Sequence, residues 1–166
     1  TTDLKDLVFT DNPSIELDNF QYRQYFGPVT IGSEGEVFDV VYDTGSGWIW
    51  VGGKGCRGCS ASKHKFDPAT SSTFDSTGES KTLRYGKGEV TGDISFDNVG
   101  VPGSAGAKSK FLPAMQGKDN DGMQSTGIVG LTPVPTDGED LLVDRLAAEG
   151  VITKREFTAY ICLLYT

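Results

Sequence analysis

The stretch FDVVYDTGSGWIWV, residues 38–51, carries the strongest structural signal in this chain of 166 residues. An apolar run ends at Asp43 and a second one begins at Trp48, which predicts a strand, a tight loop and another strand. Gly45 lets the backbone turn back until its own N–H can approach the Asp43 carboxylate, and Ser46 offers a hydroxyl to the outer carboxylate oxygen. Because a lone Asp-Thr-Gly is common at turns, its meaning depends on these flanks.

Two β-hairpins are expected around this stretch. Residues 25–32 and 36–42 are β-rich runs separated by Ser33-Glu34-Gly35. Residues 82–85 and 89–96 flank Gly86-Lys87-Gly88, and such a Gly-x-Gly predicts a hairpin whose tip is free to move.

The other segments are less regular. Residues 52–81 are rich in Gly, Ser, Lys and Thr and predict mostly loop. One helix is expected over residues 137–150, with leucines on one face, acids in its first turn and Gly150 as its stop. Residues 158–165 are a continuous apolar run that predicts a buried strand, and a chain that ends inside such a strand is expected to be incomplete.

The composition narrows the possible partners. With 15 Lys+Arg against 23 Asp+Glu, the net charge is −8, which argues against nucleic acid because phosphate binding needs clustered cations. No apolar run approaches the roughly 20 residues that a bilayer span needs, so no membrane is expected as a partner either. The 22 glycines, 9 phenylalanines and 6 tyrosines favour short strands joined by tight turns. We therefore expect one all-β domain.

The cysteines leave several readings open. Cys56 and Cys59 form a CxxC pair that could be a redox motif, a zinc knuckle with His64, or a small disulfide loop. The surrounding glycines argue against the redox motif, and a knuckle lacks its fourth ligand because Ala69 stands there. A disulfide that pins a surface turn is favoured, with His64 as a hydrogen-bonded loop residue. A bonded pair indicates an oxidising compartment, and Cys162 stands alone.

The run of residues 38–51 resembles the active-site signature of pepsin-like aspartic proteases, and other landmarks of that family follow in order from about Ile15 to Tyr165. They are Tyr25-Phe26-Gly27, Ile31-Gly32, the segment from Cys56 through Phe66-Asp67-Pro68 to Ser71-Ser72-Thr73-Phe74, Tyr85-Gly86-Lys87-Gly88 with Thr91-Gly92, and Gly127-Ile128-Val129-Gly130-Leu131. The resemblance implies an all-β N-terminal lobe, a double-psi type β-barrel half with a flap hairpin and one or two short helices. Residues 1–14 would be an N-terminal arm and residues 15–166 the lobe.

The resemblance also implies a chemistry. Members of the family use two aspartates, one per lobe, which share a proton and activate a water without metal or other cofactor. Asp43 would be one of them, and Thr44, Gly45 and Ser46 would support its loop.

Substrate contacts follow from the same resemblance. Tyr85, Gly86 and Lys87 would close over an extended peptide, with Trp50 as the hydrogen-bond partner of Tyr85. Val41 and Ile128 would line apolar subsites. A cation at the flap tip would favour acidic or polar substrate groups near the scissile bond.

One departure from the family pattern matters most, because the chain has a single Asp-Thr-Gly and one carboxylate cannot act as both acid and base. A second lobe is therefore expected, as a separate chain, a missing segment or, less favoured, a second copy of this chain. The main reading is an acid-pH aspartic endopeptidase lobe that is secreted or resides in a vacuolar or endolysosomal compartment. The alternatives are a homodimeric single-lobe protease and a non-catalytic binding or inhibitor protein of the same fold.

Overall fold

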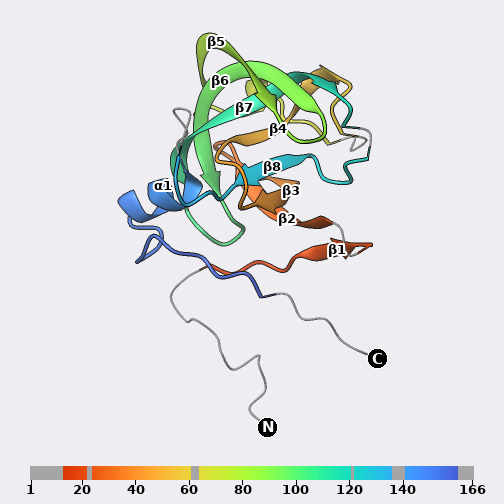
Figure 1. Ribbon diagram of the computed structural model, residues 1–166. Coiled ribbons are helices and arrows are strands. Elements are labelled where there is room, and N and C mark those ends of the chain that lie inside the picture. The colour runs from red at the N-terminus through yellow and green to blue at the C-terminus, as the bar shows by residue number, and fades with distance from the viewer. Residues whose placement is uncertain (1–12, 22–23, 61–63, 121, 136–140, 161–166) are drawn as a thin grey trace.

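The computed structural model describes residues 13–21, 24–60, 64–120, 122–135 and 141–160, and most of its regular structure is β (Figure 1). In chain order the elements are β1 (Asp18–Phe20), β2 (Gln24–Ile31), β3 (Glu36–Asp43), β4 (Ile49–Arg57), the short 3-10 helix η2 (Pro68–Thr70), β5 (Asp75–Arg84), β6 (Glu89–Gly100), β7 (Ala107–Lys118), β8 (Gly127–Gly130) and α1 (Leu142–Ala148). The predicted all-β class is confirmed. None of the described helices is long and apolar enough to cross a membrane.

The eight strands form one sheet in the order β1-β2-β3-β8-β4-β7-β6-β5. A further pairing between β2 and β6, through Thr30 opposite Gly100 and Ile31 opposite Val99, curls the sheet back on itself. Most neighbours are antiparallel, but β3 runs parallel to β8, and β4 runs parallel to β7. Thus β8 lies between the two strands that flank the loop at residues 44–48.

Both predicted hairpins are confirmed. Strands β2 and β3 pair from Phe26 opposite Val41 to Ile31 opposite Glu36, and β5 and β6 pair up to Arg84 opposite Glu89. In Figure 1 the β5–β6 hairpin stands at the opposite end of the molecule from β1.

The expectation of a mostly irregular segment over residues 52–81 is wrong. Strand β4 continues to Arg57 and β5 begins at Asp75. A Cβ on Gly53 would lie 3.0 Å from the carbonyl oxygen of Ala114 on β7, so this glycine permits close strand packing rather than a turn. β5 is polar because it is an edge strand whose side chains are mostly exposed.

The alternation of side chains along β3 places the core. Phe38 and Val40 are fully buried, whereas Val37 and Asp39 point to solvent. The ring of Phe66 meets that of Phe111 edge to face, with 5.3 Å between centroids. Each such fully buried side chain contributes about 1.5–3 kcal/mol, so these aromatic rings are a main source of the fold's stability.

The helix α1 is shorter than the sequence predicts. Leu141 has an extended backbone and is nevertheless buried, so the leucine pattern continues into residues that precede the helix. The end agrees better, since Gly150 has a φ of 71° just after the last turn. The acidic residues expected in the first turn, at positions 137, 139 and 140, lie outside the described residues.

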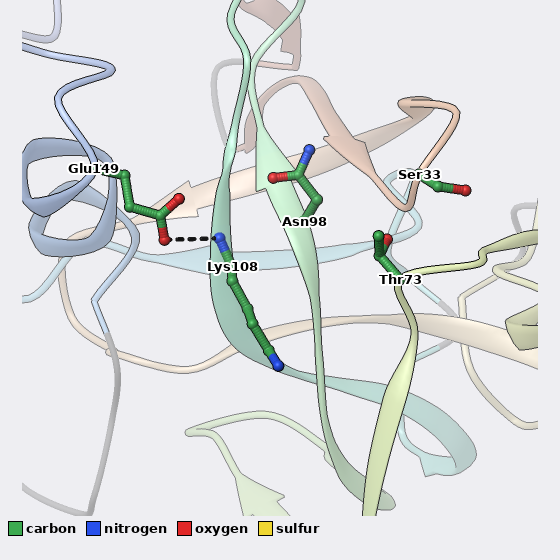
Figure 2. Close-up of a pocket in the computed structure, with 5 residues that line it drawn as sticks. All are labelled: Ser33, Thr73, Asn98, Lys108 and Glu149. Atoms are coloured by element: carbon green, nitrogen blue, oxygen red, sulfur yellow. Dashed lines mark hydrogen bonds between the residues drawn. The ribbon is translucent and has the colours of Figure 1, made fainter.

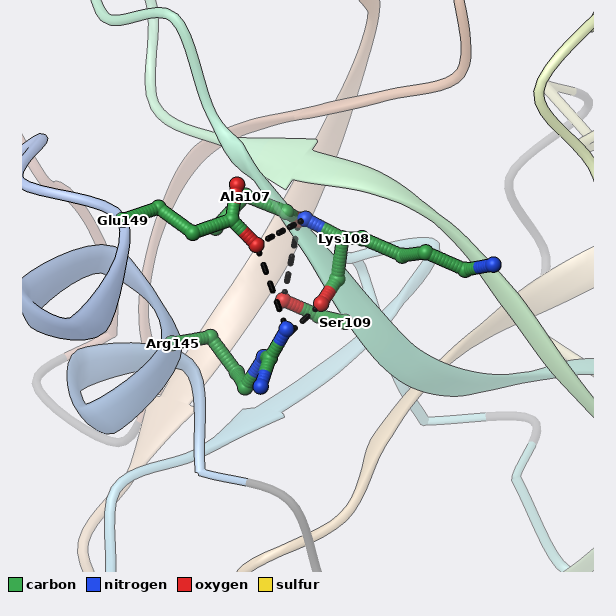
Figure 3. Close-up of polar contacts among 5 residues, drawn as sticks. All are labelled: Ala107, Lys108, Ser109, Arg145 and Glu149. Carbon is green, nitrogen blue, oxygen red and sulfur yellow. Dashed lines mark hydrogen bonds and ion pairs between the residues drawn. The ribbon is translucent and has the colours of Figure 1, made fainter.

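Arg145 of α1 and Glu149, which caps the C-terminus of the helix, hold it against an edge of β7 that no described strand covers (Figure 3). Arg145 donates from Nε to the carbonyl oxygen of Lys108 at 2.9 Å, and Glu149 accepts from the Lys108 N–H at 3.1 Å. Arg145 and Glu149 are themselves paired at 3.2 Å. Together they satisfy a stretch of β7 backbone that has β6 on one side only.

Two terminal predictions fare differently. Residues 158–160 form no strand and are exposed, Tyr160 by 67%, so the expected buried strand is wrong there. An apolar run is buried only where another surface covers it, and no described strand pairs with this one. Cys162, the rest of that run and residues 1–12 of the expected arm lie outside the described residues, and the division at residue 14 stays a prediction.

Candidate active site

Asp43 is the last residue of β3 and lies beside β8. It is in parallel register with Gly130, and its carbonyl oxygen accepts the N–H of Leu131 at 2.7 Å. The chain then leaves the sheet for residues 44–48 and re-enters at β4, on the other side of β8. The carboxylate is thus presented from the end of a strand that is fixed by neighbours on both sides.

Two hydrogen bonds orient the Asp43 carboxylate. The backbone N–H of Gly45 donates to Oδ1 at 2.9 Å, and the hydroxyl of Ser46 donates to Oδ2 at 2.7 Å. These are the contacts that the sequence pattern suggested. Asp43 and Ser46 are half-buried, whereas Thr44 and Gly45 are exposed. The middle of the loop is therefore open to solvent, while the residues on either side of it are held in place.

The loop sits against β8 with no space to spare. Gly130 donates to the carbonyl oxygen of Trp48 at 3.0 Å, and Thr132 donates to that of Ser46 at 2.9 Å. A Cβ on Gly130 would lie 2.6 Å from the Ser46 carbonyl oxygen and 2.5 Å from the Gly47 carbonyl carbon. Only glycine fits there, because both neighbours are backbone.

Tyr42 is a supporting residue that sequence reasoning did not single out. Its hydroxyl donates to the carbonyl oxygen of Pro28 at 2.8 Å, which ties β3 to β2 next to Asp43. Burial raises the pKa of Tyr42, so the phenol stays neutral and keeps its donor. The only sequence signal was an aromatic residue at the end of an apolar run, which also fits plain packing.

The predicted apolar subsite residues lie together. Val41 on β3 is in register with Ile128 on β8, and Ile128 is in register with Trp50 on β4. Val41 and Ile128 are half-buried, while Trp50 is fully buried. The structure thus brings these residues onto adjacent strands near Asp43, and their contact with substrate stays a prediction.

The predicted flap comprises the turn at residues 85–88 and the adjoining ends of β5 and β6. Tyr85 N–H donates to the carbonyl oxygen of Gly88 at 3.0 Å, and Gly86 and Lys87 are exposed at the tip. The rings of Tyr85 and Trp50 have centroids 6.4 Å apart.

The expected hydrogen bond between those two side chains is not formed. Trp50 Nε1 is buried and has no hydrogen-bond partner among the described residues. The rings pack as an aromatic pair instead, because both belong to the apolar cluster at the flap base, which includes Leu83 and Val90.

Cys56 and Cys59 form the disulfide that the sequence favoured, with a Cα–Cα distance of 6.0 Å. His64 lies 3.3 Å from the Glu36 carboxylate, and its ring centroid is 4.6 Å from that of Phe38. It is therefore a partnered loop residue, as expected, and Cys59 is bonded to Cys56 rather than available to a metal.

A surface hollow of about 380 Å³ lies elsewhere (Figure 2). Its lining residues are Ser33, Thr73, Asn98, Lys108 and Glu149. Ser33 precedes the start of β3, whereas Asp43 ends that strand, so the hollow and the carboxylate lie toward opposite ends of β3.

Comparison with known proteins gives relatives along most of the chain. Pepsin-3 of Oryctolagus cuniculus is 30% identical over 160 residues, which cover 93% of this chain and 41% of that protein. Cathepsin E-B of Xenopus laevis is 31% identical over 153 residues, which cover 89% of this chain and 38% of that protein. Vacuolar protease A of Arthroderma otae is 42% identical over 89 residues, which cover 53% of this chain and 22% of that protein.

The chain spans about two fifths of the length of the curated relatives that it matches over most of its own length. The family described as eukaryotic aspartyl protease matches residues 24–163, from the first residue of β2 onward. A match of that extent leaves little of the chain outside it, and this chain belongs to the eukaryotic aspartyl protease family.

Proposed function

We propose that this chain is the lobe of an aspartic endopeptidase that supplies Asp43 as one of two catalytic carboxylates. The observation that carries the proposal is the Asp43 carboxylate itself, which is oriented by Gly45 and Ser46 and still reachable at the rim of the lobe. A lobe used only for binding has no chemical need for a carboxylate held in this way, which disfavours the non-catalytic alternative.

The proposed reaction needs two carboxylates that share one proton. The ionised member takes a proton from water as the water oxygen attacks the scissile carbonyl carbon, and the protonated member donates to the carbonyl oxygen. The tetrahedral intermediate then collapses: the C–N bond breaks, the carboxyl group that took the proton from water gives it to the leaving nitrogen, and one hydroxyl of the intermediate returns its proton to the other carboxylate. The water is the only other reactant, and no metal or cofactor enters the proposal.

The second carboxylate would come from a second lobe facing Thr44 and Gly45. Like charges about 3 Å apart cannot both ionise, which is what makes one member an acid and the other a base. The exposed positions of Thr44 and Gly45 leave room for that lobe. Since the relatives are more than twice as long as the matched region, we favour a different lobe over a second copy of this chain.

The proposed subsites would bind an extended peptide. Val41 and Ile128 offer apolar surface, and the flap would close over the peptide and exclude water from the cleft.

The cellular compartment is inferred from the disulfide and from the name of one relative. The Cys56–Cys59 disulfide persists only where conditions are oxidising, and one relative is named a vacuolar protease. We propose that the enzyme is secreted or resides in a vacuolar or endolysosomal compartment.

Peptide cleavage at about pH 4, with the complete enzyme purified from its source or expressed with its second lobe, tests the proposal. Asp43→Asn should lower kcat/KM by about 10²- to 10⁴-fold, because the amide side chain cannot take up the proton of the attacking water. Asp39→Asn is the matched control, since that side chain is exposed on the same strand, and it should cleave like the parent enzyme. Cleavage that survives Asp43→Asn would remove Asp43 from the reaction. A native mass spectrum of the active protein then distinguishes a homodimer from an assembly with a different lobe.

A further inference from the structure

The flap tip lies against the loop that follows β7. A Cβ on Gly122 would be 3.8 Å from the Nζ of Lys87. Closer to the flap base, buried Asn120 donates from Nδ2 to the carbonyl oxygen of Glu89 at 2.9 Å. The loop and the turn at residues 85–88 are therefore fixed to one another at one end of the flap.

The same loop is held from its other side by Gln24 on β2. Gln24 donates from Nε2 to the carbonyl oxygen of Gly122 at 3.1 Å, and its Oε1 accepts the N–H of Gln124 at 3.4 Å. The described residues of this loop, 117–120 and Gly122, carry no apolar side chain. They form a polar surface beside the flap tip that is held by hydrogen bonds from Gln24.

Among the described residues of this corner, Lys87 is a cation without an ion pair. Arg84 is paired with Glu89 at 3.3 Å. The Lys87 ammonium forms no ion pair or hydrogen bond with any described residue, and the side chain is exposed. Asp121 lies outside the described residues. An anionic group brought beneath the flap would meet a cation that pairs with none of the described residues.

We propose that Lys87 makes this enzyme prefer peptides with a glutamate or aspartate within two residues of the scissile bond. The inference rests on the proposed function and names its substrate class. Closing the flap over substrate removes water around Nζ, which strengthens the attraction to a carboxylate beyond that of an open surface pair.

The preference should depend on pH in a definite direction. A lysine is protonated throughout the acid range, whereas a substrate glutamate ionises around pH 4.3. The charge attraction is thus absent below that pH and present above it. A purely steric role for Lys87 would give a preference that does not change with pH.

The test compares peptides that differ only by Glu or Gln at each of the two positions on either side of the scissile bond. With the complete enzyme at about pH 5, the best Glu peptide should be cleaved with kcat/KM roughly two- to tenfold above its Gln twin, and the ratio should fall toward one near about pH 3. Lys87→Met should bring the ratio to about one at both pH values, and Lys87→Glu should instead favour a Lys peptide over the Gln peptide.

Lys154→Met is the matched control, because Lys154 is exposed and lies 3.5 Å from Glu156, on the segment after α1. It should keep the parent ratio. If the Gln peptide is cleaved by both enzymes and the Glu-to-Gln ratio of kcat/KM is the same in Lys87→Met as in the parent, the proposal about Lys87 is overturned. Failure of the proposed function looks different: no peptide is cleaved, or cleavage of the Gln peptide survives Asp43→Asn.

Discussion

Replacing Gly127 with alanine would put a methyl group where two backbones leave no room for one. Gly127 begins β8, and a Cβ there would collide with the carbonyl oxygen of Trp50 and lie 2.8 Å from the Cα of Val51. Both obstacles are main-chain atoms of β4, so no side-chain rotation relieves the clash, and β8 must move away from β4.

The magnitude follows from that displacement. Non-bonded carbon atoms need about 3.5–4.0 Å, so the strands would have to separate by roughly 1 Å or more. Overpacking of this kind costs about 1–3 kcal/mol, and each weakened ladder hydrogen bond adds about 1 kcal/mol. The entropic gain of a Gly-to-Ala change is only about 0.4–1 kcal/mol. The clash therefore dominates, and we expect the free energy of unfolding to fall by about 3–5 kcal/mol.

Urea unfolding followed by tryptophan fluorescence measures this loss, since Trp48 and Trp50 are both buried in the parent protein. Gly86→Ala is the matched control, because a Cβ there meets nothing within 4 Å and its φ is not in the left-handed range. It should unfold within about 0.5 kcal/mol of the parent. If Gly127→Ala were as stable as Gly86→Ala, the packing of β8 between β3 and β4 would be wrong.

Three further changes have expected outcomes. Tyr42→Phe removes the hydroxyl that donates to Pro28 and should cost about 0.5–1.5 kcal/mol in urea unfolding; because burial raises the pKa of Tyr42 in the folded state, the parent should also lose stability as the pH rises beyond about 10, and the variant should lose less. Asn120→Ala leaves the carbonyl oxygen of Glu89 without the side-chain donor. Relative to the parent, amide hydrogen exchange should become faster in the flap by more than it does in the other strands. Reduction of the Cys56–Cys59 disulfide should cost only about 2 kcal/mol because its loop is short, and a larger loss would mean that the loop supports the core.

The sequence was most informative where local chemistry and apolar pattern agreed. The hairpin formed by β2 and β3 follows from alternating apolar residues around a Gly-containing turn, and its pairing is local. The loop after Asp43 could be predicted because Gly45 and Ser46 act within three residues of the carboxylate. In both cases the interacting groups are neighbours along the chain.

Features that depend on distant partners were missed. The glycines of β4 suggested a loop, but Gly53 serves a close approach to Ala114 on β7. The exposed β5 is a strand because β6 pairs with it, although its own residues show no apolar alternation. Likewise, Leu141 fits the helical pattern of α1 and yet is extended, since burial can be achieved without helical backbone.

The position of β8 between β3 and β4 follows from the family resemblance, in which residues 127–131 cross beneath the catalytic loop, and not from the residues of β8 themselves. Parallel pairing of β3 with β8 joins Val41 to Ile128, which are far apart in sequence. A short apolar run such as β8 contains no information on which two strands it will lie between. The same holds for Asn120, whose value lies in a contact with Glu89 that sequence spacing does not encode.

A crystal structure of the complete active enzyme, refined well enough to place carboxylate oxygens, measures the central claim most directly. The account predicts that a second aspartate, from outside residues 13–160, faces Asp43 with carboxylate oxygens about 3 Å apart and a water between them. An Asp43 carboxylate that faces bulk solvent, or that is covered by a surface without a second carboxyl group, would contradict it.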